Sequence, residues 1–121
     1  MYGKIVTKEE ADNLFGPVLD SIEISASDLL TLIKQTVNGV LFNIINGELI
    51  ILGDGRKALM PAGTAVAAEV VFHHYSKEIV LQLINSNSAG PVYVEQRKDK
   101  LTVTCGVSTM EWGTDCPPNC P

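Results

Sequence analysis

The dipeptide Asn46-Gly47, which joins two strongly apolar segments, constrains the fold of this chain more than any other feature. Residues 40–45 and 48–52 consist mostly of Val, Leu, Ile and Phe. Asn-Gly is the preferred centre of a type I′ turn, because both central positions of that turn need a positive φ. The sequence therefore predicts a tight antiparallel hairpin over residues 40–52.

The turn also sets the register of this hairpin and separates its two faces. We predict that Ile44 lies opposite Leu49 and that Phe42 lies opposite Ile51, which gives one purely apolar face. The other face mixes polar and aliphatic side chains, namely Leu41, Asn43, Ile45, Glu48, Ile50 and Leu52. This mixed face is still too apolar to be bare, so we expect another group to cover part of it.

A second hairpin is expected over residues 92–107, with its turn at Lys98-Asp99. Counting back from the turn places Val94 opposite Val103 on an apolar face. The opposite face carries mostly polar side chains, namely Tyr93, Glu95, Arg97, Lys100, Thr102 and Thr104. We predict a half-buried antiparallel pair whose polar face is directed toward water.

The hydrophobic periodicity of the chain stops after Gly106. We therefore predict a single α+β domain over residues 1–107 and a C-terminal tail over residues 108–121, since 121 residues are too few for two ordinary domains. The sole tryptophan, Trp112, lies in this tail. Its ring either folds back to pin the tail onto the domain or marks a surface that binds a partner.

Two helices are expected in the N-terminal part of the chain. Thr7 and Glu10 match a capping box, and Gly16-Pro17 ends the short helix that follows. A second helix begins near Ser27-Asp28, carries one apolar stripe and ends at Asn38-Gly39.

Residues 18–24 and 79–84 are each predicted to form a strand. Residues 65–75 are ambiguous, because their alanines suit a helix while their valines and phenylalanine suit a strand. We prefer a strand there because apolar and polar positions alternate. The sum is an α+β fold in which two N-terminal helices pack on an antiparallel β-meander, as a curled sheet or a partly open barrel.

Charge and hydropathy argue against two classes of partner. The formal net charge is −5, whereas nucleic-acid binding relies on an excess of positive charge. Polar residues interrupt every long apolar segment, so we expect no membrane partner. The start of the chain lacks the pattern of a signal peptide, which leads us to expect a cytoplasmic protein with reduced thiols.

Three cysteines, Cys105, Cys116 and Cys120, are weak candidates for a metal or redox site. The spacing of the last two is compatible with a zinc pair, but zinc needs four ligands and no full set is evident. A disulfide between them would close a very small loop and stabilise the chain only weakly. We therefore expect a buried Cys105, two exposed thiols on a mobile tail, and no metal or cofactor.

His73, His74 and Glu69 are weak candidates for catalysis. Neighbouring residues on a strand point to opposite faces, so the two imidazoles cannot easily share a ligand. On the predicted strand Glu69 shares the face of His73, where the two could act in general acid–base chemistry. No motif for a nucleophile accompanies them.

The leading hypothesis is a non-enzymatic binding or assembly module that forms a homo-oligomer. No complete catalytic constellation is present, and an edge strand of the 40–52 hairpin could pair with its copy across a two-fold axis. The first alternative is a small enzyme or ligand-binding barrel that uses His73, His74 and Glu69. The second alternative is a metal or thiol-redox protein that uses the three cysteines.

Overall fold

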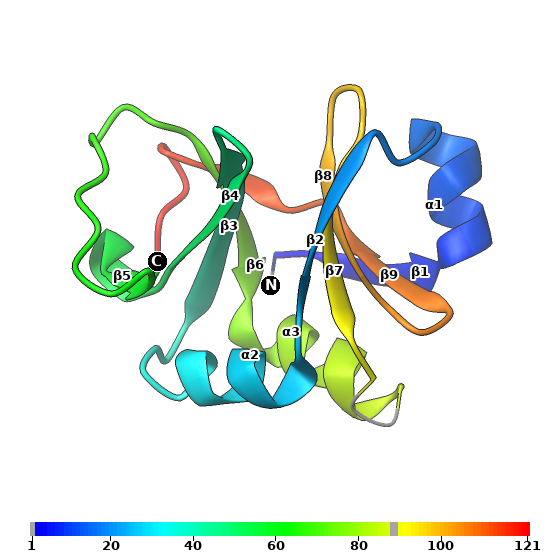
Figure 1. Ribbon diagram of the computed structural model, residues 1–121, viewed down its shortest axis with the longest axis horizontal. Helices are drawn as coiled ribbons and strands as arrows, with labels where there is room; N and C mark the ends of the chain where they lie inside the picture. The colour runs from blue at the N-terminus through cyan, green and yellow to red at the C-terminus, as the bar shows by residue number, and fades with distance from the viewer. Residues whose placement is uncertain (1, 88–89) are drawn as a thin grey trace.

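The computed structural model of this protein describes residues 2–87 and 90–121. Within these residues two antiparallel five-stranded sheets combine with three α-helices (Figure 1). The elements in chain order are β1 (Lys4–Thr7), α1 (Lys8–Phe15), β2 (Asp20–Ile24), α2 (Ala26–Ile33), β3 (Gly39–Ile45), β4 (Glu48–Leu52), a 3-10 turn (Asp54–Arg56), β5 (Ala58–Met60), β6 (Phe72–Ser76), α3 (Lys77–Asn85), β7 (Val92–Gln96), β8 (Leu101–Cys105), β9 (Ser108–Glu111) and β10 (Thr114–Cys116). The predicted α+β class is confirmed.

The two sheets face each other across one hydrophobic interior (Figure 1). Sheet A has the strand order β1-β9-β8-β7-β2, and sheet B has the order β10-β6-β3-β4-β5. Helices α2 and α3 lie together across one end of the sheets, while α1 lies on the outer side of sheet A. Among the described residues the two sheets remain separate and open. None of the helices in this part of the chain has the length and apolar character of a membrane span.

The 40–52 hairpin forms with the predicted register. Ile44 pairs with Leu49 and Phe42 pairs with Ile51, around an Asn46-Gly47 turn in which both residues have positive φ. Its two strands, however, are interior strands of sheet B, because β6 flanks β3 and β5 flanks β4. The prediction that this hairpin offers an edge strand to a second copy is therefore wrong.

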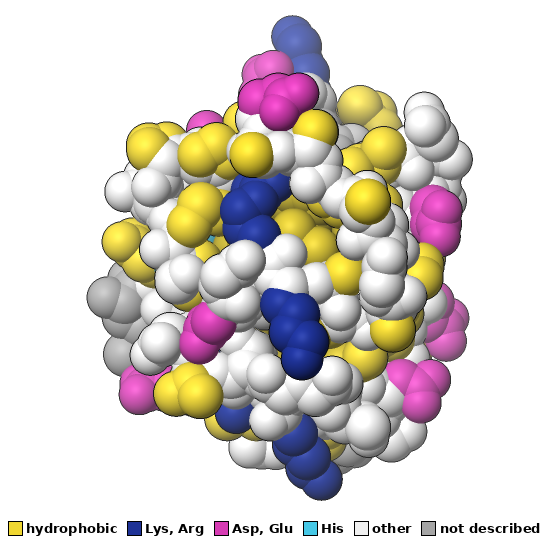
Figure 2. Space-filling view, turned by 90° about the vertical axis from the view of Figure 1, so that its left-hand side faces the viewer, with side chains coloured by type: hydrophobic (Ala, Val, Ile, Leu, Met, Phe, Trp, Pro, Cys, Tyr) yellow, Lys and Arg dark blue, Asp and Glu magenta, His cyan; other side chains and the backbone are white. Residues whose placement is uncertain are grey.

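The mixed face of the hairpin is covered by the chain itself. Leu41, Ile50 and Leu52 form a cluster with Phe72 and Cys116, which we call the outer cluster. Val66 and Val70, from the irregular segment 61–71, pack against it. Figure 2 looks onto this side of the molecule and shows hydrophobic side chains gathered on it, with a few Lys and Arg side chains among them.

The strand predicted over residues 65–75 begins only at Phe72. Residues 61–71 instead form an irregular loop over the outer face of sheet B. The apolar alternation in this segment is real, but Val66 and Val70 use it to contact the outer cluster rather than to enter a sheet. Residues 61–71 are therefore held to sheet B by the packing of those two side chains and not by strand pairing.

The strand predicted over residues 79–84 is wrong, because these residues belong to α3. Ile79, Val80, Leu83 and Ile84 are buried, and their spacing places them on one face of a helix. A run this rich in aliphatic residues fits a buried strand and a buried helix equally well. The expected pair of N-terminal helices is accordingly incomplete, since a third helix lies in the C-terminal half.

Residues 108–121, expected to form a tail, contain two paired strands. Strand β9 pairs with β8 and β1, and β10 pairs with β6. The chain crosses from sheet A to sheet B between them (Figure 1). Strands of four and three residues are too short to show periodicity, and their partners β1 and β6 lie far away in the sequence.

Candidate functional site

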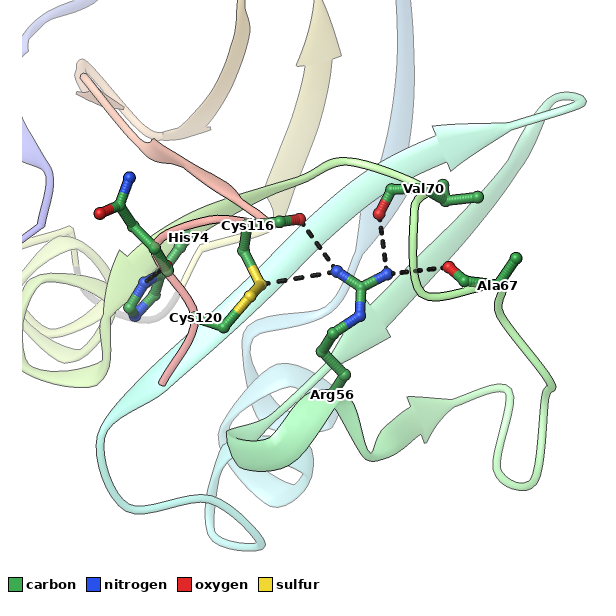
Figure 3. The surroundings of a disulfide bond; sticks show 7 residues. Arg56, Ala67, Val70, His74, Cys116 and Cys120 are labelled. Atoms are coloured by element: carbon green, nitrogen blue, oxygen red, sulfur yellow. Dashed lines mark hydrogen bonds between the residues drawn. A yellow bond between two sulfur atoms is a disulfide. The ribbon is translucent and has the colours of Figure 1, made fainter.

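A disulfide between Cys116 and Cys120 fastens the C-terminal segment to sheet B (Figure 3). The intervening turn brings the two Cα atoms to 4.8 Å, within the range that a disulfide requires. Cys116 is fully buried in the outer cluster, whereas Cys120 is exposed. The expectation of two free thiols on a mobile tail is therefore wrong.

Arg56 braces this disulfide from the neighbouring turn (Figure 3). Its Nη1 donates to the carbonyl oxygen of Cys116 at 2.9 Å and lies 3.5 Å from Cys116 Sγ. Its Nη2 donates to the carbonyl oxygens of Val70 at 2.7 Å and Ala67 at 3.2 Å. The guanidinium also lies over the Phe72 ring, 5.3 Å from the centroid. One cation thus joins the 61–71 loop to the cystine.

Asp54 fixes the turn that carries Arg56. Its carboxylate accepts backbone N–H bonds from Val37, Asn38 and Gly39 at distances of 3.0–3.3 Å. Burial opposes the ionisation of Asp54, but the backbone hydrogen bonds outweigh burial and hold its pKa below the ordinary value. Arg56 itself has a φ of 59°, a left-handed conformation that costs free energy in a non-glycine residue. The turn therefore holds the guanidinium at a fixed place.

His74 lies on the other side of the C-terminal segment, where its ring is buried. Its Nδ1 is 2.8 Å from the carbonyl oxygen of Asn119. Burial lowers the pKa of His74, although Asn119 and Asp54 oppose that shift. A carbonyl oxygen can only accept a hydrogen bond, so in the neutral ring Nδ1 carries the hydrogen and donates the hydrogen bond. A pocket of about 380 Å³ opens beside the ring, lined by Tyr2, Asn38, His74, Ser76, Cys120 and Pro121.

The three candidate catalytic residues do not share a site. His73 pairs with Phe42 of β3 and Asp115 of β10 in the sheet register, and its side chain points to the opposite face from that of His74. Burial lowers the pKa of His73 more than the Asp115 charge raises it. Glu69 is exposed in the irregular loop, and within the described residues it forms no hydrogen bond or ion pair with either imidazole.

The three candidate sulfur ligands are also separated. Cys105 is buried in the interior between the sheets, where its Sγ lies 3.5 Å from the Gly90 carbonyl oxygen and burial raises the pKa of its thiol. Cys116 and Cys120 lie on the outer side of sheet B. In the part of the chain that the structure describes, no group of three His, Cys, Asp or Glu side chains is arranged to hold a metal ion.

A second cluster of functional groups lies between α1 and the outer face of sheet A. We call it the polar layer: it comprises Lys8 and Asp12 from α1 together with Glu95, Arg97, Thr102, Thr104, Thr109 and Glu111 from the sheet. The six sheet residues are buried. The prediction that the polar face of the 92–107 hairpin is directed toward water is wrong, although the predicted pairing of Val94 with Val103 is confirmed.

Arg97 is the centre of the polar layer and has no exposed surface. It donates to Thr102 Oγ1 at 2.9 Å, to Asp12 Oδ1 at 2.8 Å and to the Gly16 carbonyl oxygen at 2.6 Å. Its Nη2 lies 3.4 Å from Glu95 Oε1, which also accepts from Thr104 at 2.5 Å. The hydrogen bond from Arg97 lowers the pKa of Asp12. Arg97 therefore links helix α1 to the sheet through polar contacts.

Glu111 is the unsatisfied member of the polar layer. Its side chain is only 1% exposed, and within the described residues neither carboxyl oxygen has a hydrogen-bond partner. Burial raises the pKa of Glu111, although the nearby Trp112 indole and Lys4 oppose that shift. Sequence reasoning missed this residue because it lies in the segment that was expected to be a tail.

Trp112 follows Glu111 at the point where the chain leaves sheet A. Its ring is 51% exposed, lies edge-on to Phe15 at 5.6 Å between centroids, and has the Lys100 ammonium 4.8 Å from its centroid. The indole therefore packs against the domain on one side, as the first interpretation predicts, and about half of it is open to solvent. Whether this exposed half binds a partner stays a prediction.

A further pocket, of about 510 Å³, lies between the end of α2 and the start of α3. Its lining comprises Lys34, Thr36, Val37, Asn38, Ser76, Lys77, Glu78 and Leu81. The Lys77 ammonium is engaged there with the Thr36 carbonyl oxygen at 2.8 Å.

No protein-family model, no curated protein and no solved structure matches this chain.

Proposed function

We propose that this protein is a non-enzymatic binding module that self-associates through the open edge of sheet A, strand β2. The observation that carries the proposal is that β2 is the longest of the four edge strands. It has five residues, against four in β1 and three each in β5 and β10. In the described part of the chain it pairs with β7 on one side only.

The other three edges have features that oppose pairing with a second copy. Strand β1 is contacted by both α1 and α3. Strand β5 is followed by Pro61 and β10 is followed by Pro117. Proline cannot donate to a strand ladder, so it stops an edge from being extended. Neither residue that directly flanks β2, Leu19 or Ser25, is a proline.

The side chains of β2 fit pairing with a second copy. In antiparallel pairing centred on Ile22, Asp20 lies opposite Ile24 of the second copy and Ser21 lies opposite its Glu23. No like charges face each other in that register, which would otherwise oppose the pairing. Leu19, which is 66% exposed, directly precedes the strand and adds apolar surface at the same edge.

Size-exclusion chromatography with light scattering, across a range of concentrations, tests the proposal. We expect a dimer that persists with reductant, because β2 contains no cysteine. A protein that stays monomeric up to millimolar concentration contradicts the proposal.

Two proline variants, Ser21→Pro and Ile22→Pro, locate the interface. Adjacent N–H groups of a strand point to opposite edges, so one proline removes an outward donor and the other removes a donor to β7. We expect one variant to give a folded monomer and the other to unfold more readily. The control Val107→Lys changes a residue that is 77% exposed at the β8–β9 turn, and it should stay dimeric. A dimer that survives in both proline variants excludes β2 as the interface.

A further inference from the structure

The two sulfur atoms of the Cys116–Cys120 disulfide have different surroundings. Cys120 is exposed and lines the pocket that contains His74. Cys116 is fully buried, with the Arg56 guanidinium 3.5 Å from its Sγ (Figure 3). An exposed sulfur is open to attack, whereas a buried sulfur beside a cation is well placed to leave as a thiolate.

We infer that this cystine is a reversible thiol–disulfide exchange site that accepts electrons from a dithiol. A thiolate of the dithiol attacks Cys120 Sγ and forms a mixed disulfide. The bond between the two cysteines breaks, and its electron pair goes to Cys116 Sγ, where the Arg56 cation stabilises the thiolate. The second thiol of the reductant then attacks the sulfur bonded to Cys120. The products are the oxidised reductant and two reduced cysteines, which take up the two protons released by the dithiol.

The position of Arg56 does not depend on the disulfide. Its Nη2 is held by the carbonyl oxygens of Ala67 and Val70, and its backbone belongs to the turn that Asp54 fixes. The left-handed φ of Arg56 is a conformation that non-glycine residues adopt when the surroundings impose it, often at functional sites. The cation is therefore already in place when the sulfur–sulfur bond breaks.

Reduction has a structural consequence at the C-terminal segment. With the bond intact, Asn119 accepts from His74 and Pro121 accepts from the Gly55 N–H at 3.2 Å. Without the covalent closure, residues 117–121 are held only by such single hydrogen bonds. The reduced protein uncovers the His74 ring and enlarges the pocket beside it. This activity is independent of the proposed self-association, because β2 lies in the other sheet.

Reduction of the native protein by dithiothreitol tests the role of Arg56. The probe is added at several concentrations without denaturant, and free thiols are alkylated and counted by mass spectrometry. We expect a rate proportional to the dithiothreitol concentration, and a rate about tenfold lower in Arg56→Met, because the leaving thiolate loses its charge-assisted contact. The matched control Lys57→Met removes a neighbouring exposed charge and should change the rate less than twofold.

Two outcomes of this experiment overturn the inference. One is a rate that does not depend on the dithiol concentration, because unfolding then limits reduction and the disulfide is only structural. The other is an Arg56→Met rate equal to or above that of Lys57→Met.

A second measurement uses only the unmodified protein. Exchange with reduced glutathione traps the first mixed disulfide, and fragmentation in the mass spectrometer locates it. We expect the adduct on Cys120, the exposed sulfur. An adduct on Cys116, or equal amounts on both residues, overturns the inference even if Arg56→Met fails to fold.

Discussion

The outer faces of the two sheets are covered in opposite ways. Sheet A is covered by a regular helix, α1, over a polar layer in which Arg97 joins Asp12, Glu95 and Thr102. Sheet B is covered by an irregular loop over an apolar cluster, and Arg56, Asn43 and a disulfide supply directional links there. Each cover contains one arginine that joins groups from separate segments of the chain.

The difference shows what each kind of cover needs. A helix satisfies its own backbone, so Arg97 acts mainly on side chains and on the end of α1 at Gly16. An irregular loop leaves carbonyl groups unpaired, so Arg56 acts on the backbone oxygens of Ala67, Val70 and Cys116. Apolar contacts stabilise the loop that covers sheet B. The arginine and the disulfide fix the position of that loop.

The strongest test of this comparison is Arg97→Met beside Arg56→Met. Removal of Arg97 leaves the Glu95 carboxylate without its main cation in a buried layer, and loss of one partner from a buried pair costs about 3–5 kcal/mol. Removal of Arg56 leaves neutral carbonyl groups at the edge of a loop, which costs about 1–2 kcal/mol. Urea unfolding followed by circular dichroism gives both values. Equal losses in the free energy of unfolding would show that the two arginines contribute equally to stability, which contradicts the comparison.

The next effect is that of the disulfide. The double variant Cys116→Ala/Cys120→Ala should lose about 2 kcal/mol, because the bond closes a small loop and removes little entropy from the unfolded chain. Urea unfolding measures this loss in the free energy of unfolding. Cys105→Ala is the control, because it removes a cysteine that is not part of the disulfide. A loss above that of Arg97→Met would mean that sheet B depends on covalent closure more than sheet A depends on its buried charge.

Glu111→Gln should stabilise the protein by about 1 kcal/mol at pH 7, because a buried carboxylate without partners is costly. Burial raises the pKa of Glu111 above its ordinary value of 4.5. Glu111 therefore ionises at a lower pH in the unfolded chain than in the folded chain. As a result, the free energy of unfolding of the wild type falls as pH rises above about 4.5. Melting temperatures at several pH values check this. We expect the difference between the two proteins to disappear below that pH, where both side chains are neutral.

The smallest expected effect is that of Lys8→Ala. Lys8 lies 3.5 Å from Asp12 and 3.8 Å from Glu95, but its side chain is 43% exposed. Partly exposed pairs contribute about 0–1 kcal/mol and weaken with salt. Urea unfolding at low and high salt should give a loss below 1 kcal/mol that shrinks further at high salt. A larger, salt-independent loss would place Lys8 among the essential members of the polar layer.

The sequence predicted the features whose causes are local. The Asn46-Gly47 turn, the register of both hairpins and the Thr7–Glu10 capping box are all present as expected. Each depends on a few neighbouring residues that favour one backbone conformation in any context. The separation of His73 from His74 follows from strand geometry in the same way.

The candidate sites could not be predicted from such local patterns. The polar layer exists because α1 packs against residues 95–111 of sheet A, and Arg97 lies 85 positions after its partner Asp12 in the chain. The cystine site exists because Arg56 meets Cys116, sixty residues away. A single sequence shows that Glu95, Arg97 and Arg56 are polar, but it does not show what covers them.

The sequence by itself therefore determined the class of the fold, its hairpins and the first helix. Only the tertiary structure decided which faces are buried, whether residues 79–84 form a strand or a helix, and how residues 108–121 are fastened. The physical reason is that turn and cap preferences act over a few residues. Burial, by contrast, depends on which distant segment packs against a given face. A short strand such as β9 is stable only when β1 and β8 pair with it on either side.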